Sequence, residues 1–331
     1  MIKPEGWARA ALAAVLVAAL GLSIAAPPAA AQAPRGQVRI LVGFPPGGSA
    51  DVVARLLAEK MRDGLGTTVI VDNRAGAAGR IAAEALKHAA PDGATIMLAP
   101  IAVTVMAPLT TRKLAFDPVA DFAPVAHAVD FQLAFVASGA LGVATLAEFV
   151  AWARANPAKA SFGSPAGGSL PHFFGVMLGR AIGVDLLHVP YRGGAPMIND
   201  LLGGQIPSTV NVLSEVVKLH EAGRVRVLAS SGQRRSAIAP EVPTFTEQGF
   251  PGISGNGWFA FHAPARTPAQ VVQALNRAIV GALADPDVAA KLRAQDLEPG
   301  GGSPEDLARL MAADSAKWRP IIEASGFSED N

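Results

Sequence analysis

The chain has no cysteine among its 331 residues. This absence excludes disulfide bonds, thiolate metal sites, a cysteine nucleophile and the thiol that anchors a lipoprotein. A metal site would have to use carboxylates and the six histidines, and five of these show no metal-ligand spacing: His88, His127, His188, His220 and His262. The sequence therefore predicts no metal and no cofactor.

An excess of charge of either sign is also missing. The chain carries 28 Lys and Arg against 27 Asp and Glu, and its first 31 residues contain Lys3, Glu5 and Arg9. Without that segment the two signs balance, which argues against nucleic acid as a partner. Half of the residues are apolar, so the chain can bury one or two ordinary cores.

Residues 1–31 have the pattern of a secretion signal. Lys3 and Arg9 begin it, residues 10–26 are an unbroken run of small and apolar residues, and small residues precede a cleavage site after Ala31. The alternative is a membrane anchor, but the run is shorter than the ~20 residues that a span requires. No later segment is apolar enough to cross a bilayer. We expect an exported protein whose signal peptide is removed.

The remaining chain alternates strand, glycine-rich turn and helix. Residues 38–44, 68–71 and 94–98 are apolar runs typical of buried strands, and helices are predicted from residue 50 or 51 and over 80–89. This order indicates a doubly wound α/β fold.

Later helices are predicted from hydroxyl residues at their first positions. The pairs are Thr145 with Glu148, Thr267 with Gln270, and Ser303 with Asp306, and the first two pairs have the residue types of a capping box.

Two apolar, strand-like runs at 131–136 and 257–261 lie far apart in the sequence. We interpret them as two crossings between lobes, with one lobe drawn from both ends of the chain. Residues 36–134 and 257–331 would form the first lobe, and residues 135–256 the second.

Two turns repeat one pattern at the end of a strand. Residues 44–51 read FPPGGSAD and residues 164–172 read SPAGGSLPH, and a helical pattern follows each. The first N–H groups of a helix lack partners and carry partial positive charge, so such a turn binds an anion without lysine or arginine. The alternative for each is an ordinary turn and helix cap. The candidate ligand-binding residues are Phe44, Pro46, Gly47, Gly48, Ser49, Asp51, Ser164, Ala166, Gly167, Gly168, Ser169 and His172.

Two of these residues have other interpretations. Asp51 is mainly a first-turn residue that favours the helix dipole, since its contact with an anion would be repulsive. His172 is expected to hydrogen-bond within its turn or to the ligand, but it also lies three residues after Ser169, and the two could act as base and nucleophile. No acid is placed by sequence to orient the histidine. An exported α/β hydrolase-like enzyme is therefore the alternative function.

Several motifs together resemble one family. Residues 44–51 belong to this set, as do 72–79 (DNRAGAAG), 90–93 (APDG), 188–196 (HVPYRGGAP), 200–205 (DLLGGQ) and 240–244 (PEVPT). In this order and spacing they are similar to the substrate-binding proteins of tripartite tricarboxylate transporters, also called the Bug family. The resemblance covers essentially the whole chain after the signal.

The resemblance implies a periplasmic receptor with the two-lobed, type II or Venus flytrap, periplasmic-binding-protein fold, each lobe a mostly parallel sheet flanked by helices. It implies a small organic carboxylate as ligand, a tripartite-type membrane permease as partner, and a monomer that is not an enzyme. A receptor that signals to a sensor is a further alternative. Tyr191 and Asn211 join the candidate ligand-binding residues, although Tyr191 could equally be a packed ring.

Two stretches depart from the family pattern. Family members often carry aspartates where residues 204–211 read GQIPSTVN, and a polar Thr-Asn-Gly where residues 99–102 read APIA. The far half of the pocket is thus expected to be less polar than usual. This favours a plain or hydrophobic carboxylate over an amino acid.

Overall fold

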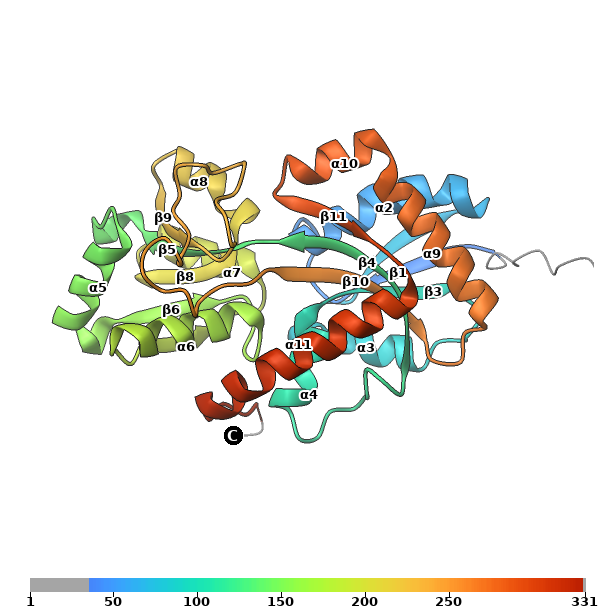
Figure 1. Cartoon of the computed structure of the whole chain (residues 1–331), viewed down its shortest axis with the longest axis horizontal. Coiled ribbons are helices and arrows are strands. Elements are labelled where there is room, and N and C mark those ends of the chain that lie inside the picture. Colours follow the sequence, from blue (N-terminus) through green and yellow to red (C-terminus); the bar gives the residue numbers. More distant parts are fainter. Residues whose placement is uncertain (1–35, 330–331) are drawn as a thin grey trace, which may run out of the picture. The chain divides into compact units, whose positions relative to one another are not determined.

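The computed structural model describes residues 36–329 and contains two β-sheets with helices on both faces (Figure 1). The predicted signal peptide, residues 1–31, lies outside the described residues. The six-stranded sheet has the order β11-β4-β10-β3-β1-β2, and the five-stranded sheet the order β7-β6-β8-β5-β9. The strands of the first are β1 (Val38–Val42), β2 (Val69–Asn73), β3 (Thr95–Pro100), β4 (Phe122–Phe131), β10 (Gly257–Pro264) and β11 (Leu297–Gly301). Those of the second are β5 (Leu133–Ser138), β6 (Ser161–Ser164), β7 (Leu187–Pro190), β8 (Ser208–Val212) and β9 (Val225–Ser230).

Both sheets mix strand directions. β1 runs parallel to β2 and β3, whereas β10 is antiparallel to β3 and β4. In the second sheet β6 runs parallel to β7 and β8, whereas β5 is antiparallel to β8 and β9. Within these mixed sheets most strands still share one direction, as predicted: β1, β2, β3 and β4 in the first sheet, and β6, β7, β8 and β9 in the second. The strands β5 and β10, which enter from the neighbouring sheet, run in the opposite direction.

Side chains along the strands of the first sheet alternate between its two faces, and helices cover both faces. In β1, Ile40 packs into the core with α2 (Ser49–Leu65) and α9 (Ala269–Ala284), whereas Leu41 faces α3 (Arg80–Lys87). The neighbouring helices are α4 (Ala107–Thr110), α10 (Pro286–Arg293) and α11 (Pro304–Ser325), with a π-helical turn at Ala102–Met106.

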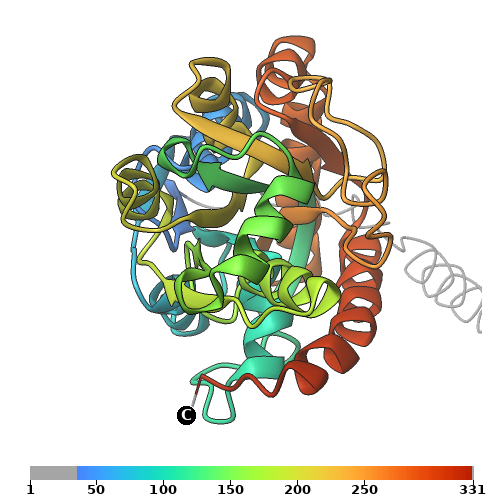
Figure 2. The ribbon, with the colours of Figure 1, turned by 90° about the vertical axis from the view of Figure 1, so that its left-hand side faces the viewer.

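The second sheet is covered in the same way. Phe135 of β5 packs in one cluster with residues of α5 (Leu146–Ala155) and α6 (Leu170–Ile182), and Val136 in another with α7 (Gly194–Leu202) and α8 (Val217–Glu221). Figure 2 shows this half of the ribbon toward the viewer. Both sheets thus have the doubly wound arrangement that the sequence predicts.

The chain passes between the sheets at two adjacent places. A single residue, Gln132, separates β4 from β5, and residues 231–256 lead back from β9 to β10. Ser231 joins the two passages, because its Oγ accepts a hydrogen bond from the Leu133 amide (2.9 Å) and its own amide donates to the Leu133 carbonyl (2.8 Å). The return passage ends before residues 257–261, which were predicted to be the second crossing. These residues belong to β10 and lie within the six-stranded sheet.

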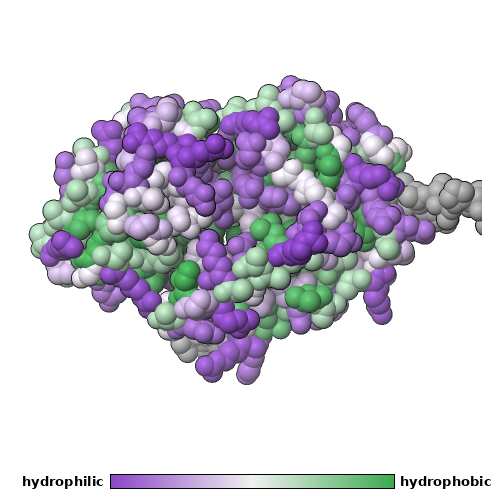
Figure 3. All heavy atoms as spheres, in the orientation of Figure 1, coloured by the Kyte–Doolittle hydropathy of each residue, from purple (hydrophilic) through white to green (hydrophobic). Residues whose placement is uncertain are grey.

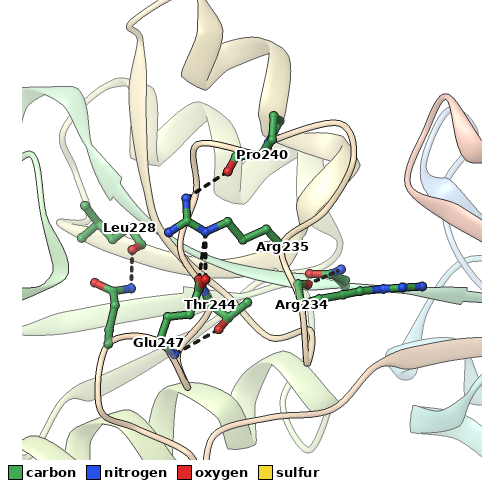
Figure 4. Close-up of polar contacts among 8 residues, drawn as sticks. Leu228, Arg234, Arg235, Pro240, Thr244 and Glu247 are labelled. Atoms are coloured by element: carbon green, nitrogen blue, oxygen red, sulfur yellow. Dashed lines mark hydrogen bonds and ion pairs between the residues drawn. The ribbon is translucent and has the colours of Figure 1, made fainter.

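Side-chain hydrogen bonds order this return segment (Figure 4). Nε of Arg235 donates to both carboxylate oxygens of Glu247 (3.1 and 3.0 Å), and its Nη1 donates to the Pro240 carbonyl (3.1 Å). Glu247 also accepts from the Thr244 amide (2.7 Å). These bonds give the segment a defined path without regular secondary structure.

The three predicted helix caps have different outcomes. Thr145 Oγ1 accepts from the Glu148 amide (3.2 Å), but the Glu148 carboxylate accepts from Ala144 instead of closing a box. The complete capping box is that of Ser303 with Asp306. The predicted cap at Thr267 is wrong, because α9 begins after Pro268 and no described residue pairs with the Thr267 hydroxyl.

Candidate functional site

A cavity of about 400 Å³ has both predicted turns in its wall. Residues 44–51, the first loop, connect β1 to α2, and residues 164–172, the second loop, connect β6 to α6. The predicted site residues that line the cavity are Phe44, Pro46, Gly47, Gly48, Ser49, Ala166, Ser169 and Asn211. The structure places the others outside its wall: Asp51, Ser164, Gly167, Gly168, His172 and Tyr191.

The strand directions explain why the two loops meet. β4 ends at the passage into the second sheet, and β1 runs in the same direction as β4, so the first loop lies at the edge that faces the second sheet. β9 ends at the return passage, and β6 runs in the same direction as β9, so the second loop faces back. Ligands of open α/β sheets bind at such carboxyl ends of strands.

Asp51 closes the first loop from inside. Its Oδ2 accepts hydrogen bonds from the Gly47 amide (3.0 Å) and Arg55 Nε (2.9 Å), and its Oδ1 accepts from Asn73 Nδ2 (2.9 Å). Burial raises the pKa of Asp51, but the bonds from Arg55, Gly47 and Asn73 outweigh it, so the pKa lies below its ordinary value. This buried carboxylate shapes the loop and occupies one amide donor that a ligand could have used.

A second carboxylate reaches the first loop from the other sheet. Glu215 follows β8, and its Oε1 accepts hydrogen bonds from the Ser49 amide (3.2 Å) and the Ser49 hydroxyl (2.8 Å). Ser49 is the first residue of α2, where the helix dipole favours an anion. The amide and hydroxyl of Ser49, which were expected to be open to a ligand, are therefore bound by the Glu215 side chain in this structure.

The second loop keeps two amides open. The hydroxyl of Ser169 donates to the Ala166 carbonyl (2.6 Å), and the Gly168 amide donates to Nδ1 of His172 (3.2 Å). Among residues 36–329, none accepts a hydrogen bond from the amides of Ser169 and Leu170. Both residues line the cavity at the N-terminus of α6. This end of the cavity can bind an anionic oxygen.

The Ser169 and His172 pair lacks the geometry of a nucleophile and its base. The Ser169 proton is directed at a carbonyl oxygen, and His172 Nδ1 accepts from a backbone amide. The His172 ring stacks on His188 with centroids 3.8 Å apart. His172 therefore bonds within its own loop.

The stacked histidines are held neutral behind the second loop. Burial, together with the neighbouring His188, lowers the pKa of His172 to about 3, and burial lowers the pKa of His188 to about 4. Ser164 Oγ donates its one proton to the Ala166 carbonyl (2.8 Å), so His188 Nε2–H donates to Ser164 (2.7 Å). These neutral rings keep the second loop in place.

We expect acid to destabilise the protein through these rings. The pKa values of both rings in the folded protein lie below the ordinary 6.5. Between the folded and the ordinary pKa the unfolded state binds more protons than the folded state, so stability is lost as the pH falls below about 6.5. Through His172 alone, the free energy of unfolding should fall by about 1.6 kcal/mol between pH 6.5 and 5, because the unfolded imidazole goes from half to almost fully protonated over this range. Urea unfolding of His172→Gln should show a correspondingly shallower pH dependence, whereas His88→Gln, at an exposed position, should follow the unchanged protein. Parallel curves for His172→Gln would contradict the prediction.

Residues 326–329 lie against the second loop from outside. The Phe327 ring meets the His172 ring edge-on at 4.5 Å between centroids. The Glu329 amide donates to the Thr110 carbonyl (2.9 Å), and its carboxylate pairs with Arg80 of α3. This segment therefore links the second loop to helices that flank the first sheet.

Tyr191 packs away from the cavity. Its hydroxyl donates to Asp200 Oδ2 (2.8 Å), and its ring packs against the cluster beneath α7. Burial, with help from Asp200, raises the pKa of Tyr191 to about 12. The packed ring is the interpretation that this geometry favours.

Several wall residues were not predicted from the sequence. Glu215 is the most consequential, because it adds a carboxylate to a wall expected to lack one. The others include Ile101, Phe131, residues 193–196 and Phe259. The available signal was position: Glu215 follows β8 at the same end of the sheet as Asn211.

The charged composition of the wall is simple. Glu215 is the one charged residue among the described residues that line it, and the wall has no lysine, arginine or histidine. Any anion in this cavity would therefore be bound by uncharged donors.

Two other features, a metal cluster and a membrane-spanning helix, are absent from the described part of the chain. Within residues 36–329, no three potential metal ligands lie together. No helix in the same part of the chain has the length and apolar character that crossing a bilayer requires.

Two α/β sheets joined by adjacent passages, with a cavity at the facing strand ends, define the two-lobed fold of periplasmic binding proteins. The structure of the periplasmic binding protein BugD superposes with a TM-score of 0.84 at 32% identity, covering 89% of this chain and 99% of that one. The family model described as tripartite tricarboxylate transporter family receptor matches residues 53–327. This chain belongs to that family of solute-binding receptors.

Other relatives agree over nearly the full length. BugT of Bordetella pertussis is 32% identical over 320 residues, which cover 94% of this chain and 97% of BugT. The structure of R. palustris Rpa4515 with adipate has a TM-score of 0.85 at 33% identity, covering 89% of this chain and 99% of that one. MatC of Rhodopseudomonas palustris with bound malate has a TM-score of 0.82 at 29% identity, covering 87% and 99%.

Proposed function

We propose that this protein is a periplasmic receptor that binds a small organic carboxylate between its lobes and delivers it to a tripartite-type membrane permease. The main support for the proposal is the cavity, because the open amides of Ser169 and Leu170 lie at one end of a wall that is otherwise largely apolar. Charge-assisted hydrogen bonds to such amides stabilise a carboxylate without a cationic side chain. The adipate and malate bound by two relatives support a carboxylate as ligand.

We also propose that the receptor acts as a monomer and is not an enzyme. On the face drawn in Figure 3, hydrophilic side chains are interspersed with hydrophobic ones, as on soluble monomers. The Ser169 and His172 geometry supports a binding role.

Calorimetric titration with a panel of carboxylates tests this function. We expect at least one to bind with a Kd of about 1 μM, or roughly 8 kcal/mol of binding free energy, which charge-assisted bonds to the open donors of the cavity together with apolar burial can supply. Ser169→Ala should weaken binding by about tenfold or less, since the backbone donors remain. Failure of every carboxylate to bind, or a turnover that Ser169→Ala abolishes, would reject the proposal. Recovery of permease subunits with the ligand-loaded protein would test the partner.

A further inference from the structure

Glu215 occupies a position that suits a ligand carboxylate. Its Oε1 accepts from both the amide and the hydroxyl of Ser49, at 3.2 and 2.8 Å, at the N-terminus of α2. These are the donors by which a helix terminus with an adjacent serine binds an anion. The two residues are 166 positions apart and belong to helical turns that follow strands of different sheets, so the bonds also join the lobes.

The Glu215 carboxylate lies close to the backbone at Gly194. Oε2 of Glu215 is 2.6 Å from where a Cβ on Gly194 would lie, so a side chain at position 194 would displace it. Gly194 is the first residue of α7, whose N-terminal dipole also favours negative charge. The Glu215 carboxylate thus lies between the starts of two helices.

A separate observation concerns Asn211, whose side chain has a donor that a ligand could bind. Asn211 is 1% exposed and lines the cavity, and its Nδ2 has no hydrogen-bond partner among the described residues. A buried amide nitrogen without a partner costs free energy, which an acceptor on a ligand would recover. This donor lines the same cavity as the open amides of Ser169 and Leu170 and is available to an acceptor on a ligand.

The rest of the wall offers hydrocarbon contacts. Ile101, Phe131, Leu170, Ile198 and Phe259 line the cavity. An uncharged end of a ligand can pack against these side chains. A second carboxylate directed at the first loop would instead find Ser49 engaged and the like charge of Glu215 beside it.

We propose that Glu215 takes the place of one ligand carboxylate and makes this receptor selective for ligands with one carboxylate over ligands with two. The inference rests on the proposed function and deepens it. It assigns a substrate class different from that of the dicarboxylate complexes of the two relatives. Glu215 acts here as a specificity-determining residue.

Calorimetry with matched acids tests the inference. The probes are monocarboxylates and α,ω-dicarboxylates of four to eight carbons, such as hexanoate and adipate. In the unchanged protein, we expect the best monocarboxylate to bind about tenfold or more tightly than the dicarboxylate of equal length. Glu215→Gln keeps an acceptor for Ser49 but removes the charge, and should bring this ratio to about one.

Glu221→Gln is the matched control. It removes the same charge from an exposed position on α8, away from the cavity wall, and should leave the ratio unchanged. Dicarboxylates that bind as tightly as monocarboxylates in the unchanged protein would overturn the inference and leave the proposed function standing. An unchanged ratio in Glu215→Gln would also overturn it. Absence of binding across the whole series would reject both.

Discussion

Replacement of Ser169 with aspartate should reduce carboxylate binding by about 100-fold or more, or roughly 2.7 kcal/mol. Ser169 is the N-cap of α6 and lines the cavity beside the open amides. Aspartate is a good N-cap, so the helix should form, but its charge would occupy the anion-binding end of the cavity. Isothermal titration with the best-binding carboxylate measures the loss.

Ser169→Asn provides the control for size and capping. Asparagine also caps helices well and carries no charge, so binding should fall by less than about tenfold. Thermal unfolding of both variants should give melting temperatures within about 4 °C of the unchanged protein, because the change of N-cap should alter the free energy of unfolding by less than about 1 kcal/mol. Equal affinities of Ser169→Asp and Ser169→Asn would show that the ligand carboxylate does not bind at α6.

The second large effect is expected at the start of the first loop. Gly43 follows β1, and an added Cβ would lie 2.5 Å from the Cα and 2.9 Å from the carbonyl oxygen of Gly79. Both neighbours are backbone atoms, so the strand and the turn before α3 would have to separate. We expect Gly43→Ala to lower the free energy of unfolding by about 3 kcal/mol and to displace the first loop.

Gly281→Ala is the matched control with the opposite expected sign. Gly281 is exposed within α9, and nothing lies within 4 Å of an added Cβ. Alanine should raise the free energy of unfolding there by about 0.8 kcal/mol, since it favours helix. Urea unfolding of both variants measures the difference, and a Gly43→Ala protein as stable as the unchanged one would disprove the close approach.

Local sequence predicted the parts of the site that have local causes. The apolar run before each Gly-Gly-Ser turn and the helical pattern after it placed both loops correctly, and α2 begins at Ser49, one residue before the earliest predicted start. Strand direction had no such signal. Nothing in residues 257–264 shows that β10 runs antiparallel to β3, because direction depends on which sheet the chain comes from.

Contacts between residues far apart in the chain could not be predicted from local sequence either, because they depend on how the strands are arranged. Glu215 ends a short 3₁₀ turn of ordinary composition, and its role depends on Ser49 in the other lobe. The stack of His172 on His188 likewise depends on the pairing of β6 with β7. Thr267 shows the limit in the other direction, since a favourable capping pattern was displaced by Pro268.

The contacts of Phe327 and Glu329 bear on how this receptor can be made into a biosensor. Phe327 supports the second loop through His172, and Glu329 holds this segment to Arg80 and Thr110. A fluorophore or surface tether attached here is expected to disturb the second loop, whose open amides are proposed to bind the ligand. Exposed positions on α9, such as Gly281, offer attachment remote from the cavity.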